Sequence, residues 1–81
     1  MSDFNESKPV EYVSVVSSNI DSVGYDEENE IMYIRFKSGS EYSYTRVPVK
    51  LYEGLINAPS KGKFFARFIK NRGDIIYNKI S

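Results

Sequence analysis

The sequence predicts a small α+β domain, a three-stranded antiparallel β-meander with two helices packed on one face and room for one extra edge strand from a terminus. Three runs rich in Val, Ile, Tyr and Phe lie within "SVGYDEENEIMYIRFKSGSEYSYTRV", separated by two short polar turns. After this stretch, apolar residues recur at helical spacing in two segments. The 81 residues, 41% of them hydrophobic, are enough for a single core.

We expect one part of the chain to be disordered and the rest to be folded. Residues 1–9 are polar and acidic and end at Pro9, which predicts a disordered segment, whereas residues 10–81 are predicted to form one domain. The chain has no apolar run near the ~20 residues of a membrane span, and its start does not have the pattern of a signal peptide. We therefore expect a cytoplasmic protein with no membrane partner.

The first hairpin is predicted from side-chain parity. A four-residue loop at residues 27–30 places Asp26 opposite Ile31 and Tyr25 opposite Met32, so the apolar residues of both strands share a face.

The second hairpin is predicted to turn through a three-residue loop, residues 38–40. This loop places Lys37 opposite Glu41, as an ion pair, and Phe36 opposite Tyr42. A shift by one residue would move every side chain of the strand to the other face of the sheet. The loop of three residues is therefore favoured, because it keeps the apolar side chains on one face. The expected core face of the sheet consists of Val23, Tyr25, Met32, Ile34, Phe36, Tyr42 and Tyr44. The hydroxyl groups of its last two tyrosines are expected to reach a polar rim near Arg46.

Two helices are expected after the meander. Pro48 suits the first turn of a helix over residues 49–57, and Pro59 ends it because proline disfavours helical geometry in the preceding residue. Ser60 is a candidate N-cap for a second helix over residues 61–71, which ends before Gly73. Its apolar face, predicted to pack on the sheet, consists of Phe64, Phe65, Phe68 and Ile69. The flanking segments "EYVSVV" and "DIIYNKI" can each add an edge strand, although neither has a clear period.

The residue types limit the chemistry of the protein. The sequence contains no Cys and no His, which excludes thiol catalysis, disulfides, Cys/His metal sites and imidazole acid–base chemistry. We therefore predict a protein that is not an enzyme, with no catalytic residues, no bound metal and no cofactor. The acidic run "DEENE" does not have the spacing of a calcium loop and is expected to be a solvated hairpin tip, and "SSNI" is expected to be a turn.

Charge is distributed unevenly along the chain, although the net charge is zero. Residues 1–43 contain three basic and nine acidic residues, and residues 44–81 contain eight basic and two acidic residues. Two interpretations are open: an anion-binding face in the second half, or attraction between the two halves within the fold.

Two sets of residues are candidates for binding an anion. The first is a stripe on the second helix, Lys63, Arg67 and Lys70, extended by Lys61 and Arg72, which can bind nucleic-acid phosphates or form an ordinary solvated face. The second is the helix N-terminus, which offers unpaired backbone N–H groups. This second set consists of Ser60, Lys61, Gly62 and Lys63, and its alternative role is a capped helix start in which Gly62 permits a close approach.

Tyr33 and Arg35 are a third candidate set, on the sheet face away from the predicted core. An aromatic ring beside a guanidinium can stack a nucleic-acid base. Cover by "EYVSVV" or by "IIY" from the terminal segments is the alternative.

The stretches "SSNIDSVGYD", "YSY" and "VPVKLYEGLINAPSKGKFF", in this order, resemble the KTSC domain, and the resemblance covers about residues 16–69. The tail departs from the family pattern, because the family often has closely spaced aromatics where this chain has Tyr77 alone. The family occurs at the C-terminus of some lysyl-tRNA synthetases and in small bacterial and phage proteins. It has no established activity, and its attachment to a synthetase suggests RNA binding.

Charge and resemblance together predict a small binding module whose partner is nucleic acid, RNA rather than DNA. The alternative is a protein–protein interaction module, such as a phage or mobile-element protein that binds a host protein. Unpaired sheet edges also leave a homo-oligomer open.

Overall fold

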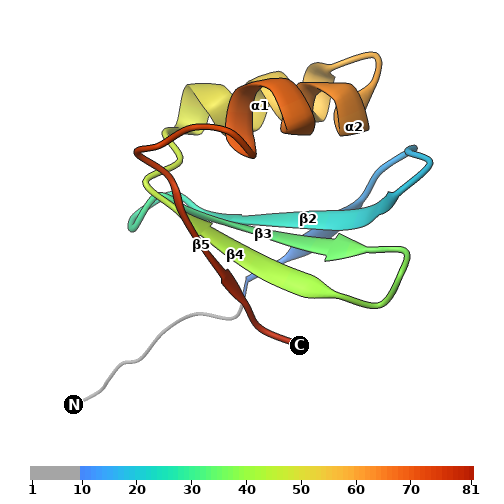
Figure 1. Cartoon of the computed structure of the whole chain (residues 1–81), viewed down its shortest axis with the longest axis horizontal. Coiled ribbons are helices and arrows are strands. Elements are labelled where there is room, and N and C mark those ends of the chain that lie inside the picture. Colours follow the sequence, from blue (N-terminus) through green and yellow to red (C-terminus); the bar gives the residue numbers. More distant parts are fainter. Residues whose placement is uncertain (1–9) are drawn as a thin grey trace.

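The computed structural model describes residues 10–81, and the segment of residues 1–9, predicted to be disordered, lies outside the described residues. Five strands form one antiparallel sheet in the order β1-β2-β3-β4-β5, and a helical layer covers one face (Figure 1). The strands are β1 (Tyr12–Ser14), β2 (Ile20–Asp26), β3 (Ile31–Phe36), β4 (Glu41–Thr45) and β5 (Ile76–Lys79). The helical layer contains α1 (Val49–Asn57), α2 (Lys61–Phe64) and the π-helix η2 (Phe65–Ile69).

The α+β class and the central meander are as predicted, but both flanking segments form edge strands where the prediction allowed one extra strand. β1 pairs with β2, and β5 pairs with β4. The close approach of β1 requires Gly24, because a Cβ at this position would collide with the Val10 side chain and lie 3.2 Å from the Glu11 carbonyl oxygen.

The first hairpin has the predicted register, with Tyr25 opposite Met32 and Asp26 opposite Ile31. Its turn is built on Asp26, whose Oδ1 accepts hydrogen bonds from the backbone N–H groups of Glu28 (3.1 Å) and Asn29 (3.2 Å). A further bond from the Asn29 side chain (2.8 Å) and these backbone bonds lower the pKa of Asp26. The acidic run therefore forms the tip of this hairpin, between the paired residues Asp26 and Ile31.

The predicted register of the second hairpin is wrong by two residues. Glu41 lies opposite Arg35, not Lys37, and Tyr42 lies opposite Ile34, not Phe36. The loop has the predicted three residues but begins one residue earlier, at Lys37. It is closed by a 2.8 Å bond from the Phe36 N–H to the Ser40 carbonyl, with Gly39 at a φ of +102°. A shift of two residues keeps every side chain on its predicted face, so the predicted core face is retained.

The second helix departs from its predicted face. The α-helix becomes a π-helix after Phe64, with a 2.9 Å bond from the Lys70 N–H to the Phe65 carbonyl, and the added residue per turn rotates the following side chains. Phe65 and Ile69 are buried on the sheet as predicted. Phe68, in contrast, is 43% exposed, and the ring of Phe64 lies against Gly54 of α1.

The core lies between the helical layer and the sheet. Its buried residues are Ile20, Val23, Met32, Ile34, Tyr44, Val47, Leu55, Phe65, Ile69 and Ile75. Burial of Tyr44 and half-burial of Tyr42 confirm the prediction that these two tyrosines belong to the core face. Within residues 10–81, no helix has the length and apolar character required to cross a bilayer.

Candidate functional site

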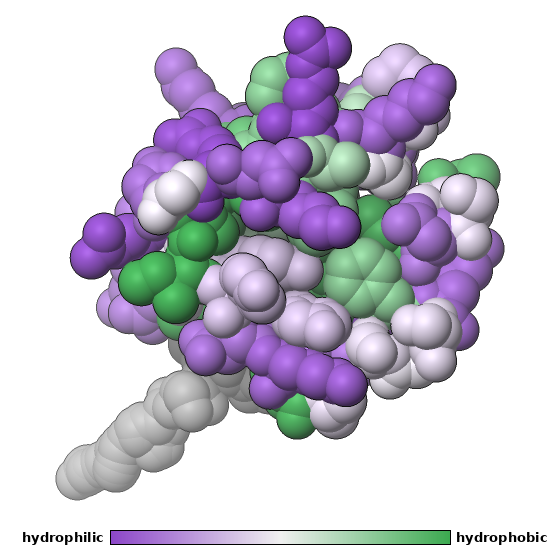
Figure 2. Space-filling model, viewed as in Figure 1, coloured by the Kyte–Doolittle hydropathy of each residue, from purple (hydrophilic) through white to green (hydrophobic). Residues whose placement is uncertain are grey.

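The three basic residues predicted to form a stripe on the second helix lie on α2, on η2 and directly after η2. We define the stripe as Lys63, Arg67 and Lys70, all three of which are exposed. Among residues 10–81 the ion pairs join Arg35 to Glu41 and Arg72 to Asp74, and none of the three stripe residues takes part in one. Figure 2 shows long hydrophilic side chains projecting from the helical layer. The stripe therefore carries three positive charges that are available to an anionic partner.

The two predicted extensions of the stripe are already engaged within the domain. The Lys61 ammonium group donates a 2.8 Å hydrogen bond to the Ala58 carbonyl oxygen at the α1–α2 junction. The Arg72 guanidinium donates two hydrogen bonds to Asp74, at 3.1 and 2.9 Å, which lower the pKa of that carboxyl group. Both side chains have local structural partners, whereas Lys63, Arg67 and Lys70 have no ion-pair partner among residues 10–81.

The predicted anion site at the helix N-terminus has the features of a capped start. The Ser60 Oγ accepts a 3.4 Å hydrogen bond from the Lys63 N–H. Gly62 lies directly against the Asn19 side chain, since a Cβ at residue 62 would be 2.8 Å from Asn19 Oδ1. The close approach that glycine permits here is confirmed, and the contact is made by a side chain of the β1–β2 connection.

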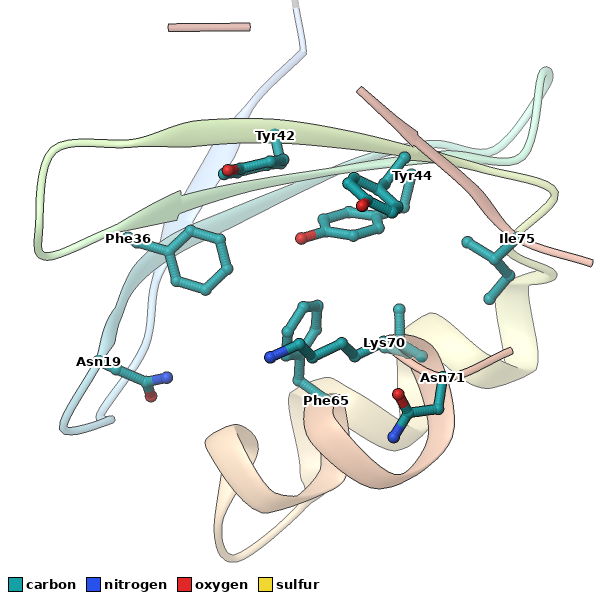
Figure 3. A pocket seen from close by; sticks show the side chains of 10 residues that line it. Asn19, Phe36, Tyr42, Tyr44, Phe65, Lys70, Asn71 and Ile75 are labelled. Atoms are coloured by element: carbon teal, nitrogen blue, oxygen red, sulfur yellow. The ribbon is translucent and has the colours of Figure 1, made fainter. Parts of the chain in front are cut away.

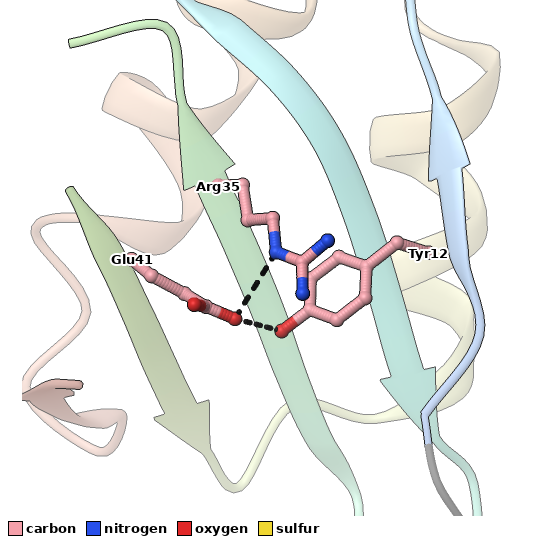
Figure 4. Close-up of polar contacts among 3 residues, drawn as sticks. All are labelled: Tyr12, Arg35 and Glu41. Carbon is pink, nitrogen blue, oxygen red and sulfur yellow. Dashed lines mark hydrogen bonds and ion pairs between the residues drawn. The ribbon is translucent and has the colours of Figure 1, made fainter. Parts of the chain in front are cut away.

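Tyr33 and Arg35 lie on the face of the sheet away from the helices, and both contact Tyr12 of β1. The ring of Tyr12 meets the ring of Tyr33 edge-on at 6.4 Å, and the Arg35 guanidinium lies 3.7 Å from the centre of the Tyr12 ring. Glu41 accepts hydrogen bonds from the Tyr12 hydroxyl and from Arg35 Nε, the latter at 3.3 Å (Figure 4). Burial, and then the bond to Glu41, raise the pKa of Tyr12 to about 12. The alternative that "EYVSVV" covers Tyr33 is thus confirmed, and these residues do not share a surface with the stripe.

A pocket that the sequence did not predict opens beside the stripe, between the helical layer and the β3-β4-β5 side of the sheet (Figure 3). Its volume is about 560 Å³. The lining residues are Asn19, Phe36, Tyr42, Tyr44, Phe65, Ile69, Lys70, Asn71, Ile75 and Tyr77. None of them is acidic, and Lys70 belongs to both the pocket and the stripe.

The aromatic side chains of the pocket form one continuous cluster. Phe65 of η2 meets Tyr44 and Phe36 of the sheet at ring-centre distances of 5.4 and 5.7 Å, both in edge-to-face geometry. Tyr42 lies 6.2 Å from both Tyr44 and Tyr77. These contacts fix the walls of the pocket, because aromatic rings at such distances attract one another.

Comparison with known proteins decides the family. A model of the KTSC domain matches residues 16–72, which is more than half of the chain. The chain belongs to the KTSC domain family. The fold agrees, since the crystal structure of a KTSC domain protein from Yersinia pestis matches with a TM-score of 0.83 and 36% sequence identity, over 90% of this chain and 100% of that one.

Relatives of this KTSC domain are of two kinds. Lysine–tRNA ligase of Nostoc punctiforme is 44% identical over 55 residues, and the same enzyme of a second Nostoc strain is 41% identical over 64 residues. These matches cover 68% and 79% of this chain but span only 10% and 11% of the ligases. An uncharacterized protein of Stutzerimonas stutzeri is 38% identical over 58 residues, covering 72% of this chain and 82% of that protein.

The pocket of this KTSC domain draws residues from well-separated parts of the chain. Asn19 precedes β2, Lys70 and Asn71 follow η2, and Tyr77 comes from β5. Tyr77 and Ile75 lie beyond the residues that match the family model. The one sequence signal that could have pointed to the pocket is the pair Tyr42 and Tyr44, whose rings were assigned to the core and whose hydroxyl groups were expected at a polar rim.

Proposed function

We propose that this KTSC domain is a non-enzymatic module that binds single-stranded RNA through the stripe of Lys63, Arg67 and Lys70. The observation that carries the proposal is the lack of ion-pair partners for these three side chains within residues 10–81. Three exposed cations along one helical segment, spread over about 10 Å, suit successive phosphates of a nucleic-acid backbone. Neutralising three phosphates releases bound counterions, so the binding weakens as salt rises.

The relatives support RNA over other polyanions. Two of them are lysine–tRNA ligases, which by name act on a transfer RNA. A module that occurs within such enzymes and also accounts for most of a small protein is suited to binding RNA independently of a catalytic domain. A direct binding measurement must test the RNA hypothesis, since shared ancestry alone does not fix a function.

The experiment is fluorescence anisotropy of labelled single-stranded RNA at about 50 mM salt. The double variant Lys63→Ala with Arg67→Ala is expected to weaken binding for all sequences alike, because phosphate contacts carry no sequence information. Lys50→Ala is the matched control, since it removes an exposed cation from α1 and leaves the stripe intact. Equal losses in the double variant and the control would reject the stripe as the binding surface.

A protein-interaction module is the second candidate function, and β5 favours it. All four residues of β5 are exposed, Ile80 just beyond it is also exposed, and the strand pairs on one side only, with β4. Such an edge can accept a strand from a partner protein. A protein captured by the wild type after nuclease treatment, and lost with Ile76→Lys, would support this candidate over the first.

A further inference from the structure

We propose that the pocket beside the stripe holds one unstacked base of the bound RNA strand. The inference rests on the proposed function, since the base belongs to the strand whose phosphates the stripe binds. The proposal requires single-stranded RNA, because a base that is paired within a duplex is not free to enter a pocket.

The first argument is a hydroxyl group of a buried residue that has no hydrogen-bond partner within residues 10–81. Tyr44 is only 5% exposed and lines the pocket, yet its hydroxyl group makes no hydrogen bond to any of residues 10–81. The Tyr25 hydroxyl, in contrast, donates to the Val47 carbonyl oxygen at 2.5 Å, and that of Tyr12 donates to Glu41. Buried polar groups almost always have partners, so the unpartnered hydroxyl of Tyr44 points to a polar group that enters the pocket from outside.

The aromatic lining indicates the shape of that ligand. Tyr77 is 64% exposed and Tyr42 is half-buried, so both present ring surface at the mouth of the pocket. Their centres lie 6.2 Å apart with the rings tilted by 49°, which leaves no room for a planar group between them but allows one to stack on either. Stacking on tyrosine is how many proteins hold single-stranded bases.

The polar lining indicates the groups at the edge of the ligand. The Asn71 side chain donates to the Ala66 carbonyl oxygen at 3.1 Å, so its own Oδ1 remains as an acceptor. The Asn19 Oδ1 accepts from the Ser17 hydroxyl at 3.0 Å, so its Nδ2 remains as a donor. A base edge carries both donors and acceptors and can pair with two such amides and the Tyr44 hydroxyl.

Charge and size fit a nucleotide. Lys70 is the one charged residue of the lining, and no carboxylate opposes it. Because Lys70 also ends the stripe, a phosphate bound there is adjacent to the pocket that takes the base (Figure 3). The volume of about 560 Å³ lies within the range of roughly 300–1,000 Å³ that is common for small-molecule sites.

The experiment compares two RNA strands of about eight nucleotides, a length within the usual site size of a single-strand-binding domain. One has a mixed base sequence, and the other has the same number of phosphates on abasic ribose. The wild type is expected to bind the base-bearing strand more tightly. Tyr44→Phe, which removes only the hydroxyl group, should lower that affinity roughly three- to tenfold and leave the abasic strand unaffected. Tyr52→Phe, whose hydroxyl lies outside the pocket lining and makes no hydrogen bond to any of residues 10–81, is the control and should change neither affinity.

The outcomes separate the pocket from the stripe. Equal affinities for the two strands would overturn the pocket and leave the stripe standing, and so would a base-dependent affinity that Tyr44→Phe does not reduce. If neither strand binds, adenosine monophosphate is added at millimolar concentration while the backbone amide resonances are recorded. Shifts confined to pocket residues such as Tyr44 and Asn71 would keep a nucleotide site and reject the RNA function, and no shifts would reject both.

Discussion

Removal of the Tyr25 hydroxyl group, by Tyr25→Phe, is expected to destabilise the domain by about 1–3 kcal/mol. The hydroxyl donates at 2.5 Å to the carbonyl oxygen of Val47, a fully buried residue between β4 and α1. The substitution would leave this acceptor without that donor while keeping the ring stacked on Tyr52, where the ring centres are 4.5 Å apart. The expected loss is large against the ~5–15 kcal/mol of a typical domain.

The same chemical change at Tyr44 is expected to give the opposite result. Tyr44 is buried, its hydroxyl has no hydrogen-bond partner among residues 10–81, and burial raises the pKa of this phenol. Tyr44→Phe therefore removes a hydroxyl group that makes no hydrogen bond to any of these residues. The variant should be as stable as the wild type or slightly more stable.

Urea denaturation followed by circular dichroism measures both variants under identical conditions. The free energy of unfolding should fall for Tyr25→Phe and hold or rise for Tyr44→Phe, with unchanged m-values. In a domain of this size, a loss of 1 kcal/mol also lowers Tm by roughly 4–8 °C, which thermal melting can confirm. Equal losses in the two variants would refute the reasoning, because they would mean that the Tyr44 hydroxyl is hydrogen-bonded in the free protein.

Alkaline pH and two glycine positions provide further tests. Because the pKa of Tyr12 is raised from 10.0 to about 12, the stability that its neutral form contributes is complete below pH 10 and is lost as pH rises toward 12. Tyr12→Phe should therefore flatten the alkaline fall in the urea midpoint, and parallel curves for variant and wild type would contradict this. Gly24→Ala should cost about 1–3 kcal/mol, since its methyl group would displace β1. Gly73→Ala, which has no atom within 4 Å of the added Cβ, is its control, and equal costs in the denaturation assay would argue against the close approach of β1.

Local signals in the sequence were sufficient for the central strands and the first helix. The register of the first hairpin follows from Asp26, which caps its own turn through backbone bonds to Glu28 and Asn29. The second register could not be decided, because Gly39 can occupy two positions of a three-residue loop and both place the same side chains in the core. The edge strands have no clear hydrophobic period that would predict them, because each pairs on one side only and is largely exposed.

The candidate site was predictable only in part. The stripe follows from helical spacing, and its three residues are exposed as expected. The engagement of Lys61 with Ala58 and of Arg72 with Asp74 depends on how the chain turns at the helix ends, which spacing does not specify. The pocket depends on tertiary contacts among residues as distant as Asn19 and Tyr77, and no local pattern connects them.

The salt dependence of RNA binding tests the central claim most directly. With three phosphates neutralised, the logarithm of the affinity for single-stranded RNA should fall with the logarithm of the salt concentration at a slope of about −2, a roughly twentyfold loss between 50 and 200 mM. Removing Lys63 and Arg67 together should make the salt dependence shallower, with a slope between 0 and about −1. Retention on RNA at ~50 mM salt no better than that of an acidic control protein would contradict the claim.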